Sequence, residues 1–394
     1  MRMSAANIYI AFSGLIGLVY NITGAYFIIM LYEFGITLEK IGIILSVYTL
    51  TVLLIDYPTG IVADIIGRKT TYCLGLALEG SSLVIFSLNL GYHVMILASV
   101  ISGFGVAMMS GSFSAWVVEE IKKERGDWGE VISRVFSLSS GIGTAAGLAS
   151  GFLASLIAIF GTRYPVLVSG ALLVIISLFL LVIGGDNRGR LEKKPLRIVV
   201  EGLKHLRRRE FLLCVISSSM MSGAFWAFAI TWQPLFHDVH GLGKEGYGML
   251  FSIMLLGVSL GNFSVPVLSK LFSRWKILIS ALLMRIPLFI ALGLTRELYS
   301  AVFIVVLIEF TLGVVGPLMA TVFNLLIPSE LRASLLSLSS SADSLTNTLV
   351  GPLAGLIVST LGYSALYNLA ALMWLASALL LLPVLTVVSR TRTE

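Results

Sequence analysis

The sequence predicts an all-α, polytopic membrane protein with twelve transmembrane helices in two pseudo-symmetric six-helix bundles. Of its 394 residues, 57% are hydrophobic and only 12% are charged, whereas soluble domains carry roughly 25% charged residues. Apolar runs of about 18 residues or more, the length that crosses a hydrocarbon layer of about 30 Å, recur along the whole chain. The one long polar stretch falls in the middle. These observations exclude a soluble globular protein.

Each apolar run between charged or turn-rich breaks predicts one helix. The first run is too long for the core of a signal peptide and is followed by no convincing small-residue cleavage site, so we expect it to stay in the mature protein. In chain order, the predicted helices cover 5–32, 41–63, 71–89, 94–118, 131–159, 164–184, 211–236, 246–269, 276–294, 298–327, 333–360 and 364–388.

The basic residues indicate the topology. With a cytoplasmic N-terminus, 22 of the 27 Lys and Arg residues fall on the inner side and four on the outer side. The positive-inside rule therefore predicts that both termini are cytoplasmic in a multi-pass protein of the cell membrane. This distribution also explains the pI of about 9.3 without a nucleic-acid partner, which would require a shared basic face.

The domain organisation follows from the central polar stretch. We expect an N-terminal bundle over 1–186, a cytoplasmic linker over 187–210 and a C-terminal bundle over 211–394. Within the linker, apolar residues recur at helical spacing against basic residues, which predicts an amphipathic helix on the membrane surface.

The loop after the second predicted helix reads G-I-V-A-D-I-I-G-R-K. This resembles the signature loop of the major facilitator superfamily, whose pattern is Gly, three residues, Asp, two residues, Gly and two basic residues. The resemblance implies a cluster that latches the two halves in one state of the transport cycle, with nearby Asp56 joining it. The matching positions are Gly60, Asp64, Gly67, Arg68 and Lys69.

An internal repeat supports two related halves, as in transporters of this kind. A shift of 206 residues sets the signature loop against 266–275, where Arg274 stands for Arg68 but Lys270 replaces Asp64. The segments 201–210 and 329–338 are also similar to segments of the family. The resemblance implies a secondary transporter, most similar to the drug-efflux branch, although the predicted fifth helix lacks that branch's Gly-Pro motif.

Four ionisable side chains fall in mid-helix, where insertion costs roughly 2.5–3.5 kcal/mol each, so each is a candidate functional group. We expect Glu309 and Asp343 to carry the coupling proton, because proton uptake removes the charge from the hydrocarbon. In the alternatives, Asp343 only bonds serines such as Ser339 and Glu309 pairs with Arg285. Glu79 and Arg285 occupy equivalent positions under the 206-residue shift, and a structural role is expected for both.

Aromatic side chains are abundant on the helices that line the central cavity in the resembled family. A pocket of aromatic rings with few charges suits large apolar or cationic compounds. Packing roles are an alternative for each residue. The candidate cavity residues are Tyr20, Asn21, Phe113, Trp116, Trp226, Gln233, Phe310 and Asn324.

The sequence thus predicts alternating-access transport, with proton-coupled efflux of small hydrophobic or cationic compounds as the main hypothesis. Uptake of a metabolite or sugar by symport is the alternative within the class. A non-transporting sensor or an intramembrane enzyme is disfavoured, because no added soluble domain and no cluster of catalytic side chains is seen. We expect no enzymatic activity, cofactor or metal. The expected partners are a small-molecule substrate, protons and the lipid bilayer, and the expected state is a monomer.

Overall fold

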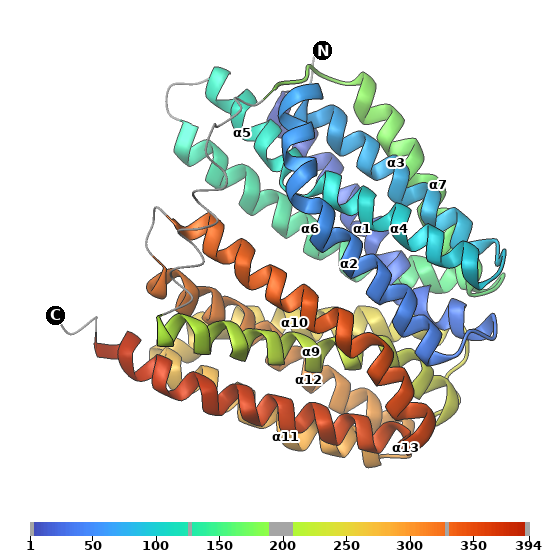
Figure 1. Ribbon diagram of the computed structural model, residues 1–394, viewed down its shortest axis with the longest axis vertical. Helices are drawn as coiled ribbons and strands as arrows, with labels where there is room; N and C mark the ends of the chain where they lie inside the picture. Colours follow the sequence, from blue (N-terminus) through green and yellow to red (C-terminus); the bar gives the residue numbers. More distant parts are fainter. Residues whose placement is uncertain (1–3, 125–127, 189–207, 328–330, 391–394) are drawn as a thin grey trace. The chain divides into compact units, whose positions relative to one another are not determined.

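The helical fold class is confirmed. The computed structural model describes residues 4–124, 128–188, 208–327 and 331–390, and within these ranges every regular element is a helix (Figure 1). The predicted amphipathic linker helix lies mostly outside the described residues. The helices are α1 (Ala5–Glu33), α2 (Leu38–Ile66), α3 (Arg68–Ser87), α4 (Tyr92–Met109), α5 (Ser112–Glu124), α6 (Trp128–Ala158), α7 (Arg163–Val182), α9 (Arg209–Asp238), α10 (Gly246–Leu271), α11 (Arg274–Leu294), α12 (Leu298–Leu326) and α13 (Arg332–Arg390).

The number of membrane spans agrees with the prediction. Eleven helical stretches of the described chain are long and apolar enough to cross a membrane, and the last covers Leu335–Ser389. Gly362 divides this last stretch, because its φ of 82° is not helical. The described residues therefore contain twelve helical stretches that could cross a membrane. The predicted helix over 94–118 is interrupted, since Gly111 with φ 68° separates α4 from α5.

The chain forms two compact units. The first contains α1, α2 from Val47 onward, α3 to α7, and α10 up to Ser252. The second contains the start of α2 up to Ser46, α9, the rest of α10, and α11 to α13. The predicted domain division over 1–186 and 211–394 differs from these units at α2 and α10, and stays a prediction.

Glycines set the helix spacing within the first unit, where α3 packs against both α4 and α7. A Cβ on Gly80 of α3 would lie 2.6 Å from the carbonyl oxygen of Gly170 on α7, and a Cβ on Gly170 would lie 2.7 Å from that of Gly80. Gly75 and Gly105 form a similar pair between α3 and α4. Small residues let helix backbones approach closely, the main route to packing in a membrane.

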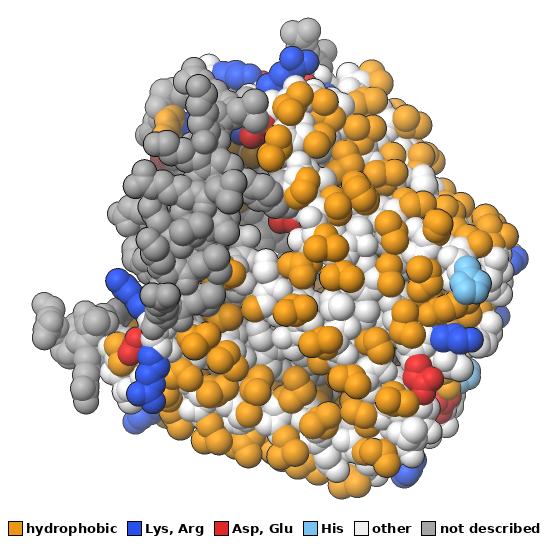
Figure 2. All heavy atoms as spheres, viewed as in Figure 1, with side chains coloured by type: hydrophobic (Ala, Val, Ile, Leu, Met, Phe, Trp, Pro, Cys, Tyr) orange, Lys and Arg blue, Asp and Glu red, His pale blue; other side chains and the backbone are white. Residues whose placement is uncertain are grey.

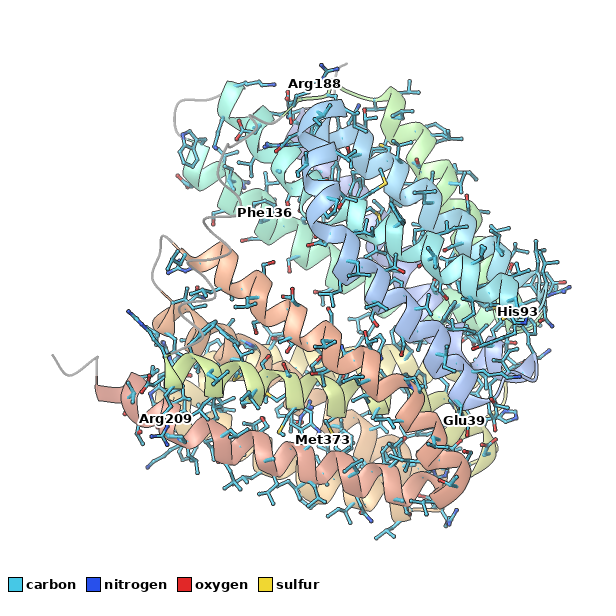
Figure 3. The ribbon with its side chains drawn as sticks, viewed as in Figure 1. Glu39, His93, Phe136, Arg188, Arg209 and Met373 are labelled. Atoms are coloured by element: carbon cyan, nitrogen blue, oxygen red, sulfur yellow. The ribbon has the colours of Figure 1, made fainter. Side chains whose placement is uncertain are left out.

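The second unit is organised around α9 and α13, which pack along much of their length. Met373 of α13 lies against Gly223 of α9, with its Cε 2.8 Å from where a glycine Cβ would stand (Figure 3). In the same unit, Gly257 and Gly261 of α10 pack on the backbone of α12. Hydrophobic side chains cover much of the face in Figure 2, as expected where lipid is the solvent.

One pair of contacts gives the sequence repeat a structural counterpart. In the second unit, a Cβ on Gly42 of α2 would overlap the backbone of Gly351 on α13. In the first unit, a Cβ on Gly248 of α10 would overlap the backbone of Gly151 on α6. Gly42 and Gly248 are 206 residues apart, the offset that aligns the signature loop with its second copy.

Candidate functional site

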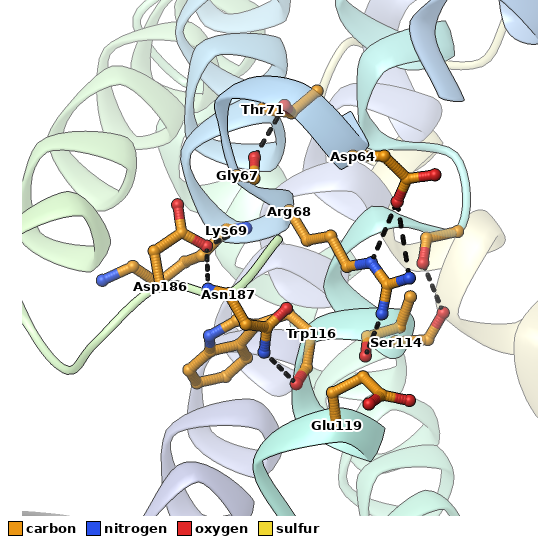
Figure 4. Close-up of polar contacts among 12 residues, drawn as sticks. Asp64, Gly67, Arg68, Lys69, Thr71, Ser114, Trp116, Glu119, Asp186 and Asn187 are labelled. Carbon is orange, nitrogen blue, oxygen red and sulfur yellow. Dashed lines mark hydrogen bonds and ion pairs between the residues drawn. The ribbon is translucent and has the colours of Figure 1, made fainter. Parts of the chain in front are cut away.

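The signature loop forms a sharp turn between α2 and α3 (Figure 4). Gly67 has a φ of 127°, a backbone conformation that residues with a side chain rarely adopt. A Cβ at this position would also overlap the carboxylate of Asp186. Glycine is therefore required for two reasons, the backbone conformation and the close approach of another segment. Gly60 lies one helix turn before Asp64 on α2, and a Cβ there would meet no neighbouring atom within 4 Å.

Asp186 caps the N-terminus of α3. Its carboxylate accepts hydrogen bonds from the backbone nitrogens of Lys69 at 2.9 Å and Thr70 at 3.0 Å, and from the Thr70 hydroxyl at 2.6 Å. The backbone nitrogen of Asn187 adds a fourth bond at 2.7 Å. Burial by itself raises the pKa of Asp186, but these hydrogen bonds outweigh it and lower the pKa below its ordinary value. A negative charge is thereby held at the positive end of the α3 dipole.

Lys69 caps the C-terminus of α7 in return. Its side chain is only 2% exposed, and Nζ donates to the carbonyl oxygens of Ile183 at 2.8 Å and Gly184 at 2.9 Å, with a longer contact to Leu181 at 3.4 Å. These carbonyls have no partner inside their own helix, so a cation stabilises them. Lys69 and Asp186 therefore tie α3 and α7 together in both directions.

Arg68 links the turn to α2 and α5. Its guanidinium donates to Oδ1 of Asp64 from Nε and from Nη2, both at 3.4 Å, and from Nη1 to the carbonyl oxygen of Ala115 at 3.4 Å. Both members of this ion pair are partly exposed, so its contribution to stability is small. Asp56, predicted to join the latch, lies two turns before Asp64 on α2, and its backbone carbonyl accepts from Thr59.

Asn187 completes the cluster. Its amide nitrogen donates to the carbonyl oxygen of Trp116 at 3.0 Å and to Oε1 of Glu120 at 2.8 Å, while Trp116 donates from Nε1 to the carbonyl oxygen of Gly185 at 3.0 Å. The segment after α7 is thus bonded to both α3 and α5. We call Asp64, Arg68, Lys69, Asp186 and Asn187 the turn cluster.

The first intramembrane acid, Glu79 of α3, is 6% exposed and accepts a hydrogen bond from the Ser102 hydroxyl of α4 at 2.5 Å. Its counterpart Arg285 on α11 is fully buried. The Arg285 guanidinium donates to the Thr311 hydroxyl and the Ile308 carbonyl, both at 2.9 Å, and lies 4.1 Å from the centre of the Trp374 ring. Both side chains join helices within one unit.

Glu309 and Asp343 differ in their surroundings. Glu309 of α12 is 4% exposed, interacts electrostatically with Arg285, and has its Cβ against Gly257 of α10. This favours the alternative in which Glu309 serves as the counter-charge of Arg285. Asp343 of α13 is only partly buried, and its two oxygens accept from the hydroxyls of Ser219 at 2.9 Å and Ser218 at 3.2 Å.

The partners of Asp343 come from α9, whereas the sequence suggested serines of its own helix. One turn further along, the hydroxyl of Ser222 on α9 donates to the side-chain oxygen of Asn347 on α13 at 3.1 Å. Asp343 and Asn347 are one turn apart and face the serines of α9 together. We call Ser218, Ser219, Ser222, Asp343 and Asn347 the polar face.

Comparison with known proteins decides the family. The model described as "Major Facilitator Superfamily" matches residues 9–335, most of the chain and all of the turn cluster. The chain belongs to the major facilitator superfamily. It is therefore a multi-pass membrane protein of a transporter family, and the resemblance drawn from Gly60 to Lys69 is confirmed.

Individual relatives of this superfamily transporter are distant. It is 24% identical over 386 residues to an uncharacterized MFS-type transporter, YxaM, of Bacillus subtilis (strain 168), covering 95% of this chain and 94% of that protein. It is 23% identical over 362 residues to the quinolone resistance protein NorA of Staphylococcus aureus (strain COL), covering 88% and 86%.

The fold of the transporter is shared with solved structures. The nucleoside transporter NupG superposes with a TM-score of 0.80 at 14% identity, covering 97% of this chain and 99% of that one. A bacterial homologue of the human lysosomal transporter Spinster, in an inward-facing and unoccupied conformation, gives a TM-score of 0.71 at 15% identity, with 98% and 96% covered. At these identities the likeness concerns the fold alone.

The predicted cavity residues of the transporter lie in several environments. Phe113 and Trp116 are buried in an aromatic stack with Tyr72, with neighbouring ring centres 4.5 to 5.4 Å apart. Phe310 lines a groove of the second unit described below, and Gln233 is buried. The Tyr20 hydroxyl contacts the Met109 sulfur, and the Asn21 amide donates to the Gly17 carbonyl. Trp226 is partly buried and Asn324 is exposed.

Asp186 and Asn187 are the site residues that sequence reasoning missed. They were assigned to the end of a bundle and the start of a linker. A local signal was present, because Gly184 and Gly185 followed by Asp and Asn is typical of a helix end followed by a capping segment. No local pattern indicates which helix is capped, because the α3 N-terminus lies 117 residues earlier in the chain.

Proposed function

We propose that the protein exports small hydrophobic or cationic organic compounds in exchange for protons, and that Asp343 carries the coupling proton. The observation behind this proposal is the polar face. Asp343 is a mid-helix carboxylate held by two neutral hydroxyls, and none of the ion pairs found among the described residues includes it. A carboxylate without a compensating cation is expensive in a membrane unless it takes up a proton.

Proton exchange at Asp343 is compatible with its partners. Hydroxyl groups both donate and accept, so Ser218 and Ser219 can bond the carboxylate or reorient toward a protonated acid. Glu309 is a second candidate, but its electrostatic interaction with the buried Arg285 favours a role as the partner of that guanidinium within the second unit. The two carboxylates of the original hypothesis thus receive different roles.

The direction of transport is inferred from relatives. NorA is named for quinolone resistance, and similarity to it favours export of organic compounds. The alternative is uptake of a metabolite by symport, and the likeness in fold to a nucleoside transporter is compatible with it. We further infer that both termini face the cytoplasm of the cell membrane, from the charge distribution, and that the protein acts as a monomer without enzymatic activity.

The experiment uses purified full-length protein in liposomes with an imposed pH gradient and the lipophilic cation ethidium as probe. Wild-type protein is expected to accumulate ethidium against its gradient when the compartment receiving it is acidic. Asp343→Asn preserves the size of the side chain and an acceptor for a serine but cannot exchange a proton. We expect it to lose gradient-driven accumulation at least tenfold while keeping ethidium exchange at equal pH.

The matched control is Glu130→Gln at the exposed start of α6, which should transport as the wild type does. Retained pH-driven accumulation in Asp343→Asn would refute the role of Asp343. A wild-type protein that ignores ethidium but takes up a radiolabelled nucleoside down the proton gradient would favour the symport alternative.

A further inference from the structure

A groove on the second unit is separate from both the turn cluster and the polar face. It has a volume of about 360 Å³, within the range of roughly 300–1,000 Å³ for small-molecule sites. The end of α10 and the first half of α11 form its walls, and α12 forms its floor. Its lining includes Phe272, Lys276, Met284, Phe310 and Val314.

The groove is lined mostly by apolar side chains, and some of them are exposed. Phe272 is 57% exposed and Met284 is 43% exposed, so both present apolar surface outside the helix packing. On the floor, the hydroxyl of Thr311 is already bonded, because it accepts from Arg285 and donates to the Ile308 carbonyl. The interior therefore offers contact area for an aliphatic chain and no free hydrogen-bonding group on its floor.

The mouth of the groove is positively charged. Lys276 is exposed in the first turn of α11, at the positive end of the helix dipole. Lys270 and Arg274, six and two residues before Lys276, line a separate cavity of about 470 Å³. No Asp or Glu occurs from 246 to 296, so no neighbouring acid along this segment neutralises these three cations. An anionic group is thus favoured at this end.

The depth of the groove matches one leaflet of a bilayer. On α11 the lining of the groove runs from Lys276 to Met284, eight residues, which corresponds to about 12 Å at 1.5 Å per residue. Half of a hydrocarbon layer of about 30 Å is only slightly longer. An apolar groove of this length, with a lysine at the end predicted to be cytoplasmic, suits one acyl chain of a phospholipid whose headgroup lies at the cation.

We propose that this groove binds one anionic phospholipid of the inner leaflet. Its phosphate lies at Lys276 and the start of α11, and an acyl chain runs past Met284 to Phe310. The site would hold a lipid between α10 and α11 and fill the space that the helices leave over α12. This inference does not depend on the transported compound or on the coupling ion.

The test is native mass spectrometry of delipidated full-length protein with added palmitoyl-oleoyl phosphatidylglycerol or phosphatidylcholine. Wild-type protein is expected to retain the first phosphatidylglycerol at least threefold more than phosphatidylcholine. Lys276→Gln should abolish this preference, and Met284→Trp, which fills the groove, should reduce retention of both lipids at least threefold. Because both side chains are exposed, neither change should prevent folding.

Two controls are matched by position. Met249→Trp replaces a methionine of similar exposure, 49%, on α10 away from the groove, and Lys122→Gln removes a cytoplasmic lysine that pairs with Glu119. Both should bind lipid as the wild type does. Equal retention of the two lipids by wild type, or unchanged binding in Lys276→Gln, would overturn the headgroup assignment. Equally tight binding of dihexanoyl phosphatidylglycerol or inorganic phosphate would overturn the acyl-chain assignment.

Discussion

The capping of α3 by Asp186 leads to a quantitative prediction. Asp186→Ala removes the acceptor of two backbone N–H groups at the start of α3, those of Lys69 and Thr70. Losing an N-cap side chain costs about 0.5–2 kcal/mol and typically about 1. Since the lost bonds are charge-assisted and thus stronger than neutral ones, we expect about 1.4 kcal/mol.

Hydrogen exchange measures this loss directly. A change of about 1.4 kcal/mol in local opening speeds exchange of these amides about tenfold. The assay is exchange followed by mass spectrometry on peptides that span Gly67 to Thr71 in detergent-solubilised protein. Glu297→Ala serves as a matched control, because Glu297 caps α12 in the same manner through Tyr299 and Ser300 and should change exchange only there. Unchanged exchange at the start of α3 in Asp186→Ala would refute the capping argument.

The pH dependence of the same cap has a definite sign. Hydrogen bonds lower the pKa of Asp186 below its ordinary value of 3.8, so its contribution is complete above the unfolded-state pKa and is lost as the pH falls through the lower folded-state pKa. The difference in Tm between wild type and Asp186→Ala should therefore be constant from about pH 8 to pH 5 and shrink below about pH 4. A difference that grows on acidification would contradict this assignment.

Two further predictions concern helix packing. Gly170→Val places a side chain against the backbone of Gly80 and should destabilise the first unit by about 1–3 kcal/mol, measured as a lower Tm. The control is Gly141→Val, which should change the Tm little because a Cβ at Gly141 meets nothing within 4 Å. Equal effects of the two substitutions would contradict the packing argument. Arg285→Lys loses the planar stack on Trp374 and should destabilise the second unit by about 2 kcal/mol. Thermal unfolding followed by intrinsic fluorescence measures this loss. A Tm equal to that of the wild type would show that the stack contributes nothing.

The helix positions and the signature turn were predicted from the sequence almost correctly. Hydrophobic length is a local property, so most helix bounds agree to within a few residues, and the spacing from Gly60 to Lys69 predicted both a tight turn and the family. Where prediction failed, the cause was also local. Ser110 and Gly111 break the fourth span because Gly111 adopts a positive φ, and glycine in an apolar run is ambiguous between close packing and a break.

The partners of the charged side chains were not predictable in the same way. The sequence showed that Lys69 is basic and lies at a loop, but its burial and its bonds to the end of α7 depend on a segment more than 110 residues away. For Asp343 the hydroxyl partners lie on α9, about 125 residues earlier. Helical periodicity gives the face of a residue only relative to its own helix.

The sequence alone predicted twelve membrane-spanning helices, two related halves and membership of a transporter family. These follow from hydrophobic length, charge distribution and a spaced motif, which act over tens of residues. Only the tertiary structure decided which charge meets which partner. It placed Asp186 at the start of α3, Glu309 near Arg285, and Asp343 opposite the serines of α9. In a membrane an unpaired polar group is costly, so these pairings are fixed by packing between distant helices.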